Sequence, residues 1–484
     1  MFEEWSLNFE SSTPCYLQIY SYIKSCIFSG TLPIGTKLPT QKELAIQFGV
    51  NRSTVVTATE LLAADDLIKS NGKGGTIVKN NASSLNAPPP PNWTSYIHAG
   101  SHYPNKSTVQ LINNNEHRTD IYALTRPELS KELFIPEMLK EMRMYNALDP
   151  DSLGYDHPNG NFLLRENLCS YYADLGVKVN PDQILIVSGA LQALYLISAG
   201  ILFRGSAILT EAQSYIYSVN VFQSAGMRLF GIPADENGIS IANLEKTHSQ
   251  TNASILYSIP NFNNPTGILM SEERKKRLYQ FCQNRKLPVI EDDTYRELYF
   301  TERKPIPLKF YDTNELILLV GSCSKVLFPG FRLGWIVGTK PVIDRLADIK
   351  TQIDLGTNTL SQRLMNFLVE STYYSQHLEH IRGCLRERRD FVLDILNRNF
   401  HGLCSWSIPK GGVYIWLSIN PNISVSKLFQ RCLKNKVLFC PGDIYSSHAN
   451  NSIRISYSYL PLRDLECSLL LLKQCMLEEL NLMS

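Results

Sequence analysis

The stretch GSCSKVLFPGFRLGW, residues Gly321–Trp335, comes directly after the apolar run LILLV, residues Leu316–Val320. A short run that is apolar throughout, without alternation, is typical of a strand buried on both faces of a sheet. Similar runs, separated by helical patterns, occur in QILIVSG, SAILTE, ASILYSIP and PVIEDD. From about Thr108 onward the sequence therefore predicts an α/β domain with parallel strands, and Lys325 follows one of these strands.

The residues around Lys325 are serines, glycines, a proline and an arginine, which a surface lysine does not require. An ε-amine can form a Schiff base with an aldehyde, and pyridoxal 5′-phosphate (PLP) is the usual aldehyde in proteins. The hydroxyls of Ser322 and Ser324 and the guanidinium of Arg332 could bind its phosphate. The stretch thus predicts a PLP-binding lysine beside a phosphate site.

A second group of phosphate donors is predicted in IVSGALQALYL, residues Ile186–Leu196. The pattern is that of a strand, a tight glycine turn and a helix. The backbone N–H groups of Gly189, Ala190 and Leu191 would then point from the helix N-terminus toward an anion.

The PLP ring needs a carboxylate at its pyridine nitrogen, donors at its 3′-oxygen and a flat neighbour. The run PVIEDDTYRELYF ends a strand with three consecutive acids, among them Asp292, and an acid at a strand's carboxyl end is well placed for a site. Solvated loop acids are an equally good interpretation of this motif alone. Asn264 in IPNFNNPTG, Tyr295 and Tyr215 could supply the amide, the phenol and the flat ring.

The composition limits the classes of protein that the chain can represent. With 484 residues, 44% hydrophobic and 19% charged, it is globular, and its net charge of +2 excludes a polycation. Its 11 scattered cysteines without a C-x-x-C pair, and the lack of a signal pattern or a membrane-length apolar run, favour a cytoplasmic protein that binds no membrane. We expect no metal site, because His377 and His380 lack a third ligand and are interpreted as a solvated helix face.

The first 80 residues have a different pattern. In residues 38–68, Thr40 caps one helix, Gly49 allows a turn and residues 51–54 open a second helix. Two short helices joined by a glycine turn form a helix-turn-helix, and the glycine-rich run Leu67–Val78 is predicted to be a wing.

The charge of this region supports DNA binding only weakly. Between Pro14 and Lys79 there are seven basic and four acidic residues, and a small helical interaction domain is the alternative. The following run, KNNASSLNAPPPPNW, cannot build a packed core and predicts an extended linker. We therefore expect a DNA-binding domain at residues 12–80, a linker at 81–107 and a PLP-binding domain at 108–484.

The motifs SGTLPIGTKLPT, ELA, GVNRSTV and the glycine wing, all in register, resemble the winged helix-turn-helix of the GntR family of bacterial regulators. The resemblance implies an α+β fold that binds DNA. The DNA contacts that it implies are Lys42, Asn51, Arg52, Ser53 and Thr54 and, in the wing, Gly72, Lys73 and Gly74. Where the family often has an arginine after TV, this chain has Val56 and Thr57, so base specificity is expected to depend more on Arg52 and the wing.

The larger region resembles fold type I aminotransferases through the ordered motifs SLGYDHPNG, SGALQAL, PNFNNPTG, EDDTY, SCSKVLFPGFRLGW, GGVYIWL and IRISYS. The resemblance implies Lys325 as the lysine that forms an aldimine with PLP, Asp292 at the pyridine nitrogen and Arg454 at a substrate carboxylate. It also implies Asn264 and Tyr295 at the 3′-oxygen, Tyr215 against the ring, Ser322, Ser324 and Arg332 on the phosphate, and Tyr155 and Gly160 in the cleft, with packing an equal alternative for the last two. Leu191 replaces a polar residue of many relatives, so its phosphate contact is expected to come from the backbone.

The two regions and the proline-containing linker together resemble the MocR subfamily of bacterial transcription factors. The resemblance implies a multi-domain chain, a head-to-tail homodimer on promoter DNA with paired half-sites, and a response to PLP or to a small amino compound. One alternative is an active PLP-dependent aminotransferase with a DNA-binding appendage. Another is a regulator of vitamin B6 synthesis for which PLP itself is the signal.

Overall fold

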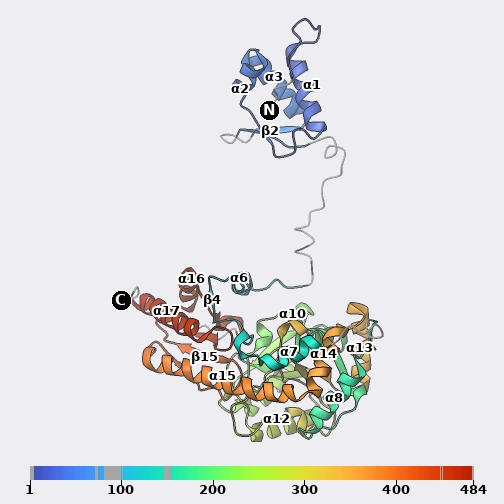
Figure 1. Cartoon of the computed structure of the whole chain (residues 1–484), viewed down its shortest axis with the longest axis vertical. Helices are drawn as coiled ribbons and strands as arrows, with labels where there is room; N and C mark the ends of the chain where they lie inside the picture. Colours follow the sequence, from blue (N-terminus) through green and yellow to red (C-terminus); the bar gives the residue numbers. More distant parts are fainter. Residues whose placement is uncertain are drawn as a thin grey trace. The chain divides into compact units, whose positions relative to one another are not determined.

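The computed structural model describes residues 5–70, 75–80, 97, 100, 102–145, 154–446, 449 and 451–481. The chain divides into two compact units, Met1–Gly100 and Ser101–Ser484, and each is described by itself (Figure 1). Within the described ranges, none of the helices combines the length and apolar character that a membrane crossing needs.

The N-terminal unit packs three helices against a small antiparallel sheet in the order β1-β3-β2. Its elements are α1 (Cys15–Phe28), β1 (Lys37–Leu38), α2 (Gln41–Phe48), α3 (Arg52–Ala64), β2 (Ile68–Ser70) and β3 (Thr76–Val78). Val55, Ala58 and Leu62 form the buried stripe of α3 and share a core with Ile19 and Ile23 of α1. The predicted helix-turn-helix is confirmed; strand β1, of two residues, was not predicted.

The start and the end of α2 follow from two residues. The side chain of Thr40 accepts a hydrogen bond from the N–H of Glu43 at 3.3 Å, and the Glu43 carboxylate accepts one from the N–H of Thr40 at 2.7 Å. This reciprocal cap satisfies two N–H groups that a helix start leaves without a partner. Gly49 ends the helix with a φ of 67°, a left-handed conformation that glycine adopts without strain. The predicted cap and turn are therefore confirmed.

The centre of the larger unit is a seven-stranded sheet in the order β5-β13-β12-β11-β10-β6-β7. Its strands are β5 (Ile184–Val187), β6 (Ala207–Glu211), β7 (Arg228–Ile232), β10 (Ile255–Ser258), β11 (Val289–Asp292), β12 (Ile317–Ser322) and β13 (Gly334–Val337). The five predicted strands are confirmed with a common direction. The prediction missed β7, which pairs parallel with β6, and β13, which pairs antiparallel with both β12 and β5. The connection from β12 to β13 contains no α-helix and is too short for a parallel crossover, so the chain returns antiparallel.

Helices cover both faces of this sheet, which explains why its strands are apolar without alternation. One face shares a core with α9 (Ala190–Gly200), α10 (Val221–Ser224) and α13 (Lys340–Asp354). The other face packs on α8 (Phe162–Ala173), α11 (Ile241–Thr251), α12 (Glu272–Arg285) and α14 (Thr359–Glu370). Because all strands of the sheet except β13 run in the same direction, their carboxyl ends lie at one edge of the sheet.

A smaller sheet in the order β14-β15-β18-β17 completes the larger unit. Its strands are β14 (Cys404–Trp406), β15 (Tyr414–Ile419), β17 (Cys440–Pro441) and β18 (Ser452–Ser456), and two-residue pairs are formed by β4 (Tyr122–Ala123) with β16 (Val437–Leu438) and by β8 (Ala234–Asp235) with β9 (Gly238–Ile239). The remaining helices are α6 (Ser107–Asn115), α7 (Pro136–Met144), α15 (Thr372–Asn399), α16 (Val425–Lys434) and α17 (Leu462–Asn481), of which α15, orange in Figure 1, has 28 residues.

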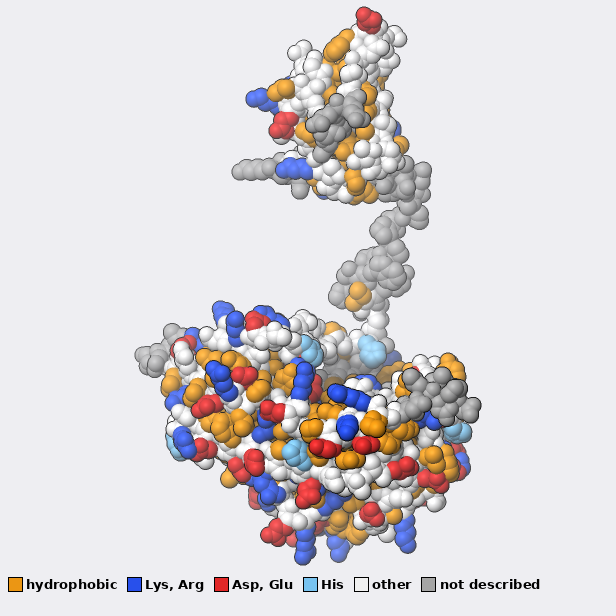
Figure 2. Space-filling model, in the orientation of Figure 1, with side chains coloured by type: hydrophobic (Ala, Val, Ile, Leu, Met, Phe, Trp, Pro, Cys, Tyr) orange, Lys and Arg blue, Asp and Glu red, His pale blue; other side chains and the backbone are white. Residues whose placement is uncertain are grey.

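The surface of the larger unit carries charges of both signs. Figure 2 shows basic and acidic side chains interspersed over the visible face of the larger unit, in keeping with the small net charge.

The interpretation of a solvated histidine face is wrong for His377, which is fully buried with Nε2 2.9 Å from the carbonyl oxygen of Val326. His377 belongs to the same buried helical stripe as Ile381 and Leu385, and its burial lowers its pKa to about 4. His380, one turn later, is exposed.

Candidate ligand cavity and DNA-binding surface

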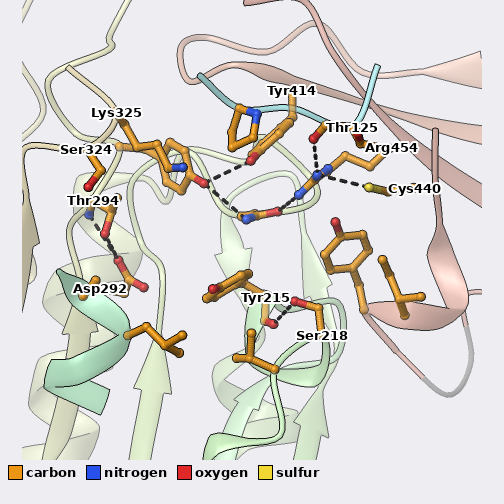
Figure 3. Close-up of a pocket in the computed structure, with 18 of the residues that line it drawn as sticks. Thr125, Tyr215, Ser218, Asp292, Thr294, Ser324, Lys325, Tyr414, Cys440 and Arg454 are labelled. Atoms are coloured by element: carbon orange, nitrogen blue, oxygen red, sulfur yellow. Dashed lines mark hydrogen bonds between the residues drawn. The ribbon is translucent and has the colours of Figure 1, made fainter. Parts of the chain in front are cut away.

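A cavity of about 400 Å³ opens at the carboxyl ends of the parallel strands (Figure 3). Polar groups reach it from the loops after several strands, which is where α/β sheets bind ligands. The predicted residues that line it are Gly189, Ala190, Leu191, Tyr215, Asn264, Asp292, Tyr295, Ser322, Ser324, Lys325, Arg332 and Arg454. Residues far apart in the sequence therefore meet in one site.

The amine of Lys325 projects into this cavity without a hydrogen bond or ion pair to another described residue. Burial lowers the pKa of Lys325 to about 8, the charges of Glu128 and Asp292 oppose the shift, and those of Arg454 and Arg332 add to it. About a tenth of the amine is therefore neutral at pH 7, the state in which it attacks an aldehyde.

Asp292 ends β11 and is 4% exposed. One of its oxygens accepts a hydrogen bond from the hydroxyl of Tyr257 at 2.8 Å, and the other accepts bonds from the hydroxyl and the N–H of Thr294 at 2.5 and 3.2 Å. Burial raises the pKa of Asp292, whereas these hydrogen bonds oppose the rise by stabilising the ionised form.

The two acids beside Asp292 are buried as well, so the interpretation of solvated loop acids is wrong. Glu291 points away from the cavity and accepts hydrogen bonds from the N–H groups of Leu308 and Lys309 at 2.6 and 2.8 Å. Asp293 forms an ion pair with Arg296 at 2.6 Å. Alternate residues of a strand face opposite sides, and only Asp292 of the three lines the cavity.

The predicted phosphate donors differ in whether their side chains already form hydrogen bonds within the protein. The hydroxyl of Ser322 donates to the carbonyl of Leu333 at 3.2 Å, whereas Ser324 has no side-chain partner among the described residues. Arg332 donates one N–H to the carbonyl of Ser188 at 3.2 Å and keeps its other donors. Ser324 and Arg332 are therefore the donors that are available without rearrangement.

The N–H of Gly189 differs from those of the next two residues. It donates to the carbonyl of Val187 at 2.8 Å, whereas Ala190 and Leu191 begin α9 and have no acceptor for their N–H groups within the helix. The anion contact of Gly189 stays a prediction. Gly189 has a φ of 91°, and a Cβ there would lie 2.9 Å from Nη2 of Arg332. Glycine is thus needed both for the turn and for the approach of the arginine.

Arg454 of β18 lines the cavity on the side away from Lys325 and Ser324 (Figure 3). Its Nη1 donates to Asn264 at 2.8 Å, and its Nη2 donates to the carbonyl of Thr125 at 2.9 Å and contacts Sγ of Cys440 at 3.2 Å. The guanidinium lies 3.9 Å from the ring centroid of Tyr414. Its Nε is buried without a partner and is thus free to donate to a ligand.

The predicted 3′-oxygen donors belong to the same network. The side-chain amide of Asn264 donates to the hydroxyl of Tyr295 at 3.3 Å, which lies 3.2 Å from the hydroxyl of Tyr414. Tyr215 lines the cavity, and burial raises its pKa to about 12. These phenols are therefore hydrogen-bond donors at neutral pH.

Some predicted residues lie outside the cavity. Tyr155 is 84% exposed and does not line it, so its role in the cleft stays a prediction. For Gly160 packing is the explanation, because a Cβ there would lie 2.4 Å from the side chain of Ile186.

Other lining residues were not predicted. They include Thr125, Thr294, Tyr414, Cys440, Tyr445 and, from the start of the larger unit, Asn105, Val109, Ile112, Asn113 and Glu116. Only Tyr414, in GGVYIWL, and Thr294, after the three acids, lie within motifs that could have revealed them.

The segment that leads into α6 is attached to the larger unit by a few hydrogen bonds. The N–H of Tyr103 donates to Ser224 at 3.1 Å, and Asn220 donates to the carbonyl of Pro104 at 3.1 Å. Lys106 donates to the carbonyl of Asp443 at 2.7 Å. This segment then forms one wall of the cavity.

The predicted DNA contacts in the N-terminal unit lie at the start of α3 and on α2. Lys42, Asn51, Arg52 and Ser53 are exposed and Thr54 is partly buried. The exposed side chains are therefore free for a major groove, which the second helix of a helix-turn-helix enters. The wing residues Gly72, Lys73 and Gly74 lie outside the described residues.

Comparison with known proteins agrees with this division of the chain. Residues 15–78 match the family "bacterial regulatory proteins, gntR family", and residues 127–466 match "aminotransferase class I and II". YdfD, an uncharacterised HTH-type transcriptional regulator of Bacillus subtilis strain 168, is 45% identical over 454 residues, which cover 94% of each chain. The HTH-type transcriptional regulator NorG of Staphylococcus aureus strain N315 is 34% identical over 429 residues, 87% of this chain and 95% of NorG.

Among solved structures, LysN, an α-aminoadipate aminotransferase of Thermus thermophilus complexed with N-(5′-phosphopyridoxyl)-L-leucine, has a TM-score of 0.74 and 30% identity over 81% of this chain and all of LysN (100%). Fold and relatives thus define a transcriptional regulator with a winged helix-turn-helix and a fold type I aminotransferase-like domain. The chain belongs to the GntR family and, within it, to the MocR subfamily.

Proposed function

We propose that this regulator binds PLP covalently through Lys325 and changes its DNA binding in response to PLP or to a small amino compound. The observation that carries the proposal is the convergence, in one cavity, of an amine of lowered pKa, a buried carboxylate and an arginine with an unpaired N–H. The similarity to LysN, which was solved with a phosphopyridoxyl amino acid, supports it.

The residues present fit PLP in kind. Ser324, Arg332 and the N-terminus of α9 offer donors for a phosphate, and the missing Cβ of Gly189 leaves room for the guanidinium of Arg332. Asp292 offers a carboxylate whose ionised form is hydrogen-bonded by Tyr257 and Thr294, as a protonated pyridine nitrogen requires.

Each predicted side chain of the cavity is assigned to one part of PLP or of the amino compound. When bound, PLP supplies an aldehyde that combines reversibly with primary amines and a ring that withdraws electrons. Lys325 provides the neutral amine that attaches to it, and Ser322 with Ser324 and Arg332 would hold its phosphate. Asn264 and Tyr295 would donate to its 3′-oxygen, Tyr215 would lie against its ring, and Arg454 would bind the carboxylate of an incoming amino compound through Nε.

DNA binding would come from the N-terminal unit. Arg52, Asn51, Ser53 and Thr54 would enter a major groove, with Lys42 on a phosphate and Gly72, Lys73 and Gly74 in the wing. We infer a cytoplasmic head-to-tail homodimer on promoter DNA with paired half-sites, because two tethered readers bind such sites with high effective concentration.

The test is to incubate the purified full chain with PLP, reduce it with borohydride and locate the adduct by mass spectrometry. We expect the adduct on Lys325, and none at this position in Lys325→Ala, which should keep its circular dichroism spectrum and lose the ligand response of its DNA binding. A native chain without an adduct on Lys325, or a variant that keeps the full response, would refute the proposal.

Aminotransferase turnover is the alternative, and the combination of Lys325 with the Arg454 network favours it. Complete turnover of an amino donor with an oxo-acid at ordinary enzyme rates, ~1–1000 per second, would support this alternative. If PLP is itself the signal, PLP alone should alter DNA binding without any amine.

A further inference from the structure

One acidic residue in the cavity wall has no role in the proposed PLP site. Asp292 and Glu116 are the carboxylates among the described lining residues, and Asp292 is assigned to the pyridine nitrogen. Glu116 follows α6 directly, and 23% of its side chain is exposed. Asn113 and Ile112 of α6 line the same wall.

Glu116 also lacks a strong cationic partner. Its nearest partners are the hydroxyl of Thr125, which donates at 3.4 Å, and the exposed ring of His117 at 3.7 Å. Arg126 is engaged by Glu128 through two contacts of 3.1 and 3.2 Å. Among the described residues no lysine or arginine forms an ion pair with Glu116. Burial and the charge of Glu128 raise the pKa of Glu116, whereas the charges of His117 and Arg126 and the hydrogen bond from Thr125 oppose the rise. A ligand cation in contact with Glu116 would stabilise its ionised form further.

Glu116 lies close to the arginine proposed for a ligand carboxylate. Thr125 links the two, because its carbonyl accepts from Nη2 of Arg454 at 2.9 Å while its hydroxyl donates to Glu116. Since a single residue spans them, the guanidinium and the carboxylate are no more than about 10 Å apart. Allowing for hydrogen-bond contacts of about 2.8 Å at either end, a ligand that touches both needs only a short chain between its charged groups.

We propose that the effector is an amino acid with a second, cationic amino group on a short side chain. Its carboxylate binds Arg454, its distal ammonium binds Glu116, and its remaining amine faces Lys325. This inference rests on the proposed function and names the chemical class of ligand for the same cavity. It follows from two groups, the buried Nε of Arg454, which has no partner, and the carboxylate of Glu116, whose contacts to Thr125 and His117 are long.

The test compares two ligands that differ in one group. Ornithine and norvaline have the same carbon chain, and only ornithine carries a terminal ammonium. Calorimetric titration of the full chain, with and without PLP, should show ornithine binding about 10- to 100-fold more tightly, as expected for a charge-assisted hydrogen bond. In Glu116→Gln this ratio should fall to about one, whereas Glu137→Gln, which neutralises an exposed carboxylate outside the cavity, should keep it.

A charge reversal guards against loss of folding as an explanation. Glu116→Lys should prefer glutamate to norvaline, a gain that a misfolded chain cannot produce. Equal binding of ornithine and norvaline by the native chain, no binding of either ligand to the PLP-loaded chain, or an unchanged ratio in Glu116→Gln would overturn the inference. A chain that takes up no PLP and still discriminates through Glu116 would retain this inference and refute the proposed function. A chain that takes up PLP but binds ornithine and norvaline equally would retain the proposed function and refute this inference.

Discussion

The lowered pKa of Lys325 predicts an amine that reacts at a pH where ordinary lysines are protonated. The cause is burial in the cavity wall, which disfavours the ammonium form and moves the pKa from 10.5 to about 8. Well below pH 8, the neutral fraction of Lys325 should therefore exceed that of an ordinary lysine by roughly 300-fold.

Competitive labelling measures this difference directly. The full chain without PLP, mixed with a reference peptide that has a blocked N-terminus and one lysine with a free ε-amine, is treated with traces of acetic anhydride from about pH 6 to about pH 11, a range that brackets both pKa values. Mass spectrometry then gives the labelling of Lys325 at each pH. We expect half-maximal labelling near the pKa of about 8 for Lys325 and near 10.5 for the reference peptide.

Two variants test the cause of the shift. Glu128 raises the pKa of Lys325 by its charge, so Glu128→Gln should move the midpoint further down. Glu137→Gln, an exposed and distant change, should leave it in place. Coincident midpoints for Lys325 and the reference peptide would refute the argument from burial.

Three further predictions concern the core, the cofactor site and DNA. His377 stays neutral in the folded chain down to its pKa of about 4, whereas the unfolded chain takes up a proton near 6.5. The free energy of unfolding should therefore drop by on the order of 3 kcal/mol as the pH falls through this window, and His377→Gln should flatten that slope in urea titrations; parallel curves would contradict it. Gly189→Ala adds a Cβ in a left-handed conformation against Arg332, so PLP affinity measured by absorbance should fall at least about tenfold, and native affinity would show that the site has more room than the structure allows. Arg52→Ala should weaken binding to DNA selected from a random pool by roughly 1–3 kcal/mol if Arg52 reads a base; equal binding by gel shift would remove it from the contacts.

The cavity residues at the ends of the strands could be predicted from the sequence, because strand topology brings them together. Lys325 and Asn264 follow buried strands and Asp292 ends one, and the carboxyl ends of such strands meet at one edge of a sheet. Local patterns therefore sufficed to bring them together. Their roles toward PLP stay predictions.

The missed part depends on tertiary packing. Ile112 of α6 and Glu116, which follows α6 directly, lie in a segment without a distinctive motif. They line the cavity through contacts with residues far away in the sequence. The hydrogen bond from Gly189 to Val187 likewise depends on the geometry of one turn, which the glycine itself leaves open. His377 was misjudged because a pair of histidines was weighed without the apolar stripe of the helix that carries it.

The attachment of residues 103–106 has a mechanical consequence. These residues belong to the end of the predicted linker, residues 81–107, and hydrogen bonds to Ser224, Asn220 and Asp443 hold them immediately before α6. Tension transmitted along the chain from a DNA-bound N-terminal unit would enter the larger unit here, at the cavity wall, before it reaches any strand of the central sheet. A ligand in the cavity and a force along the chain from the N-terminal unit would thus both act on α6.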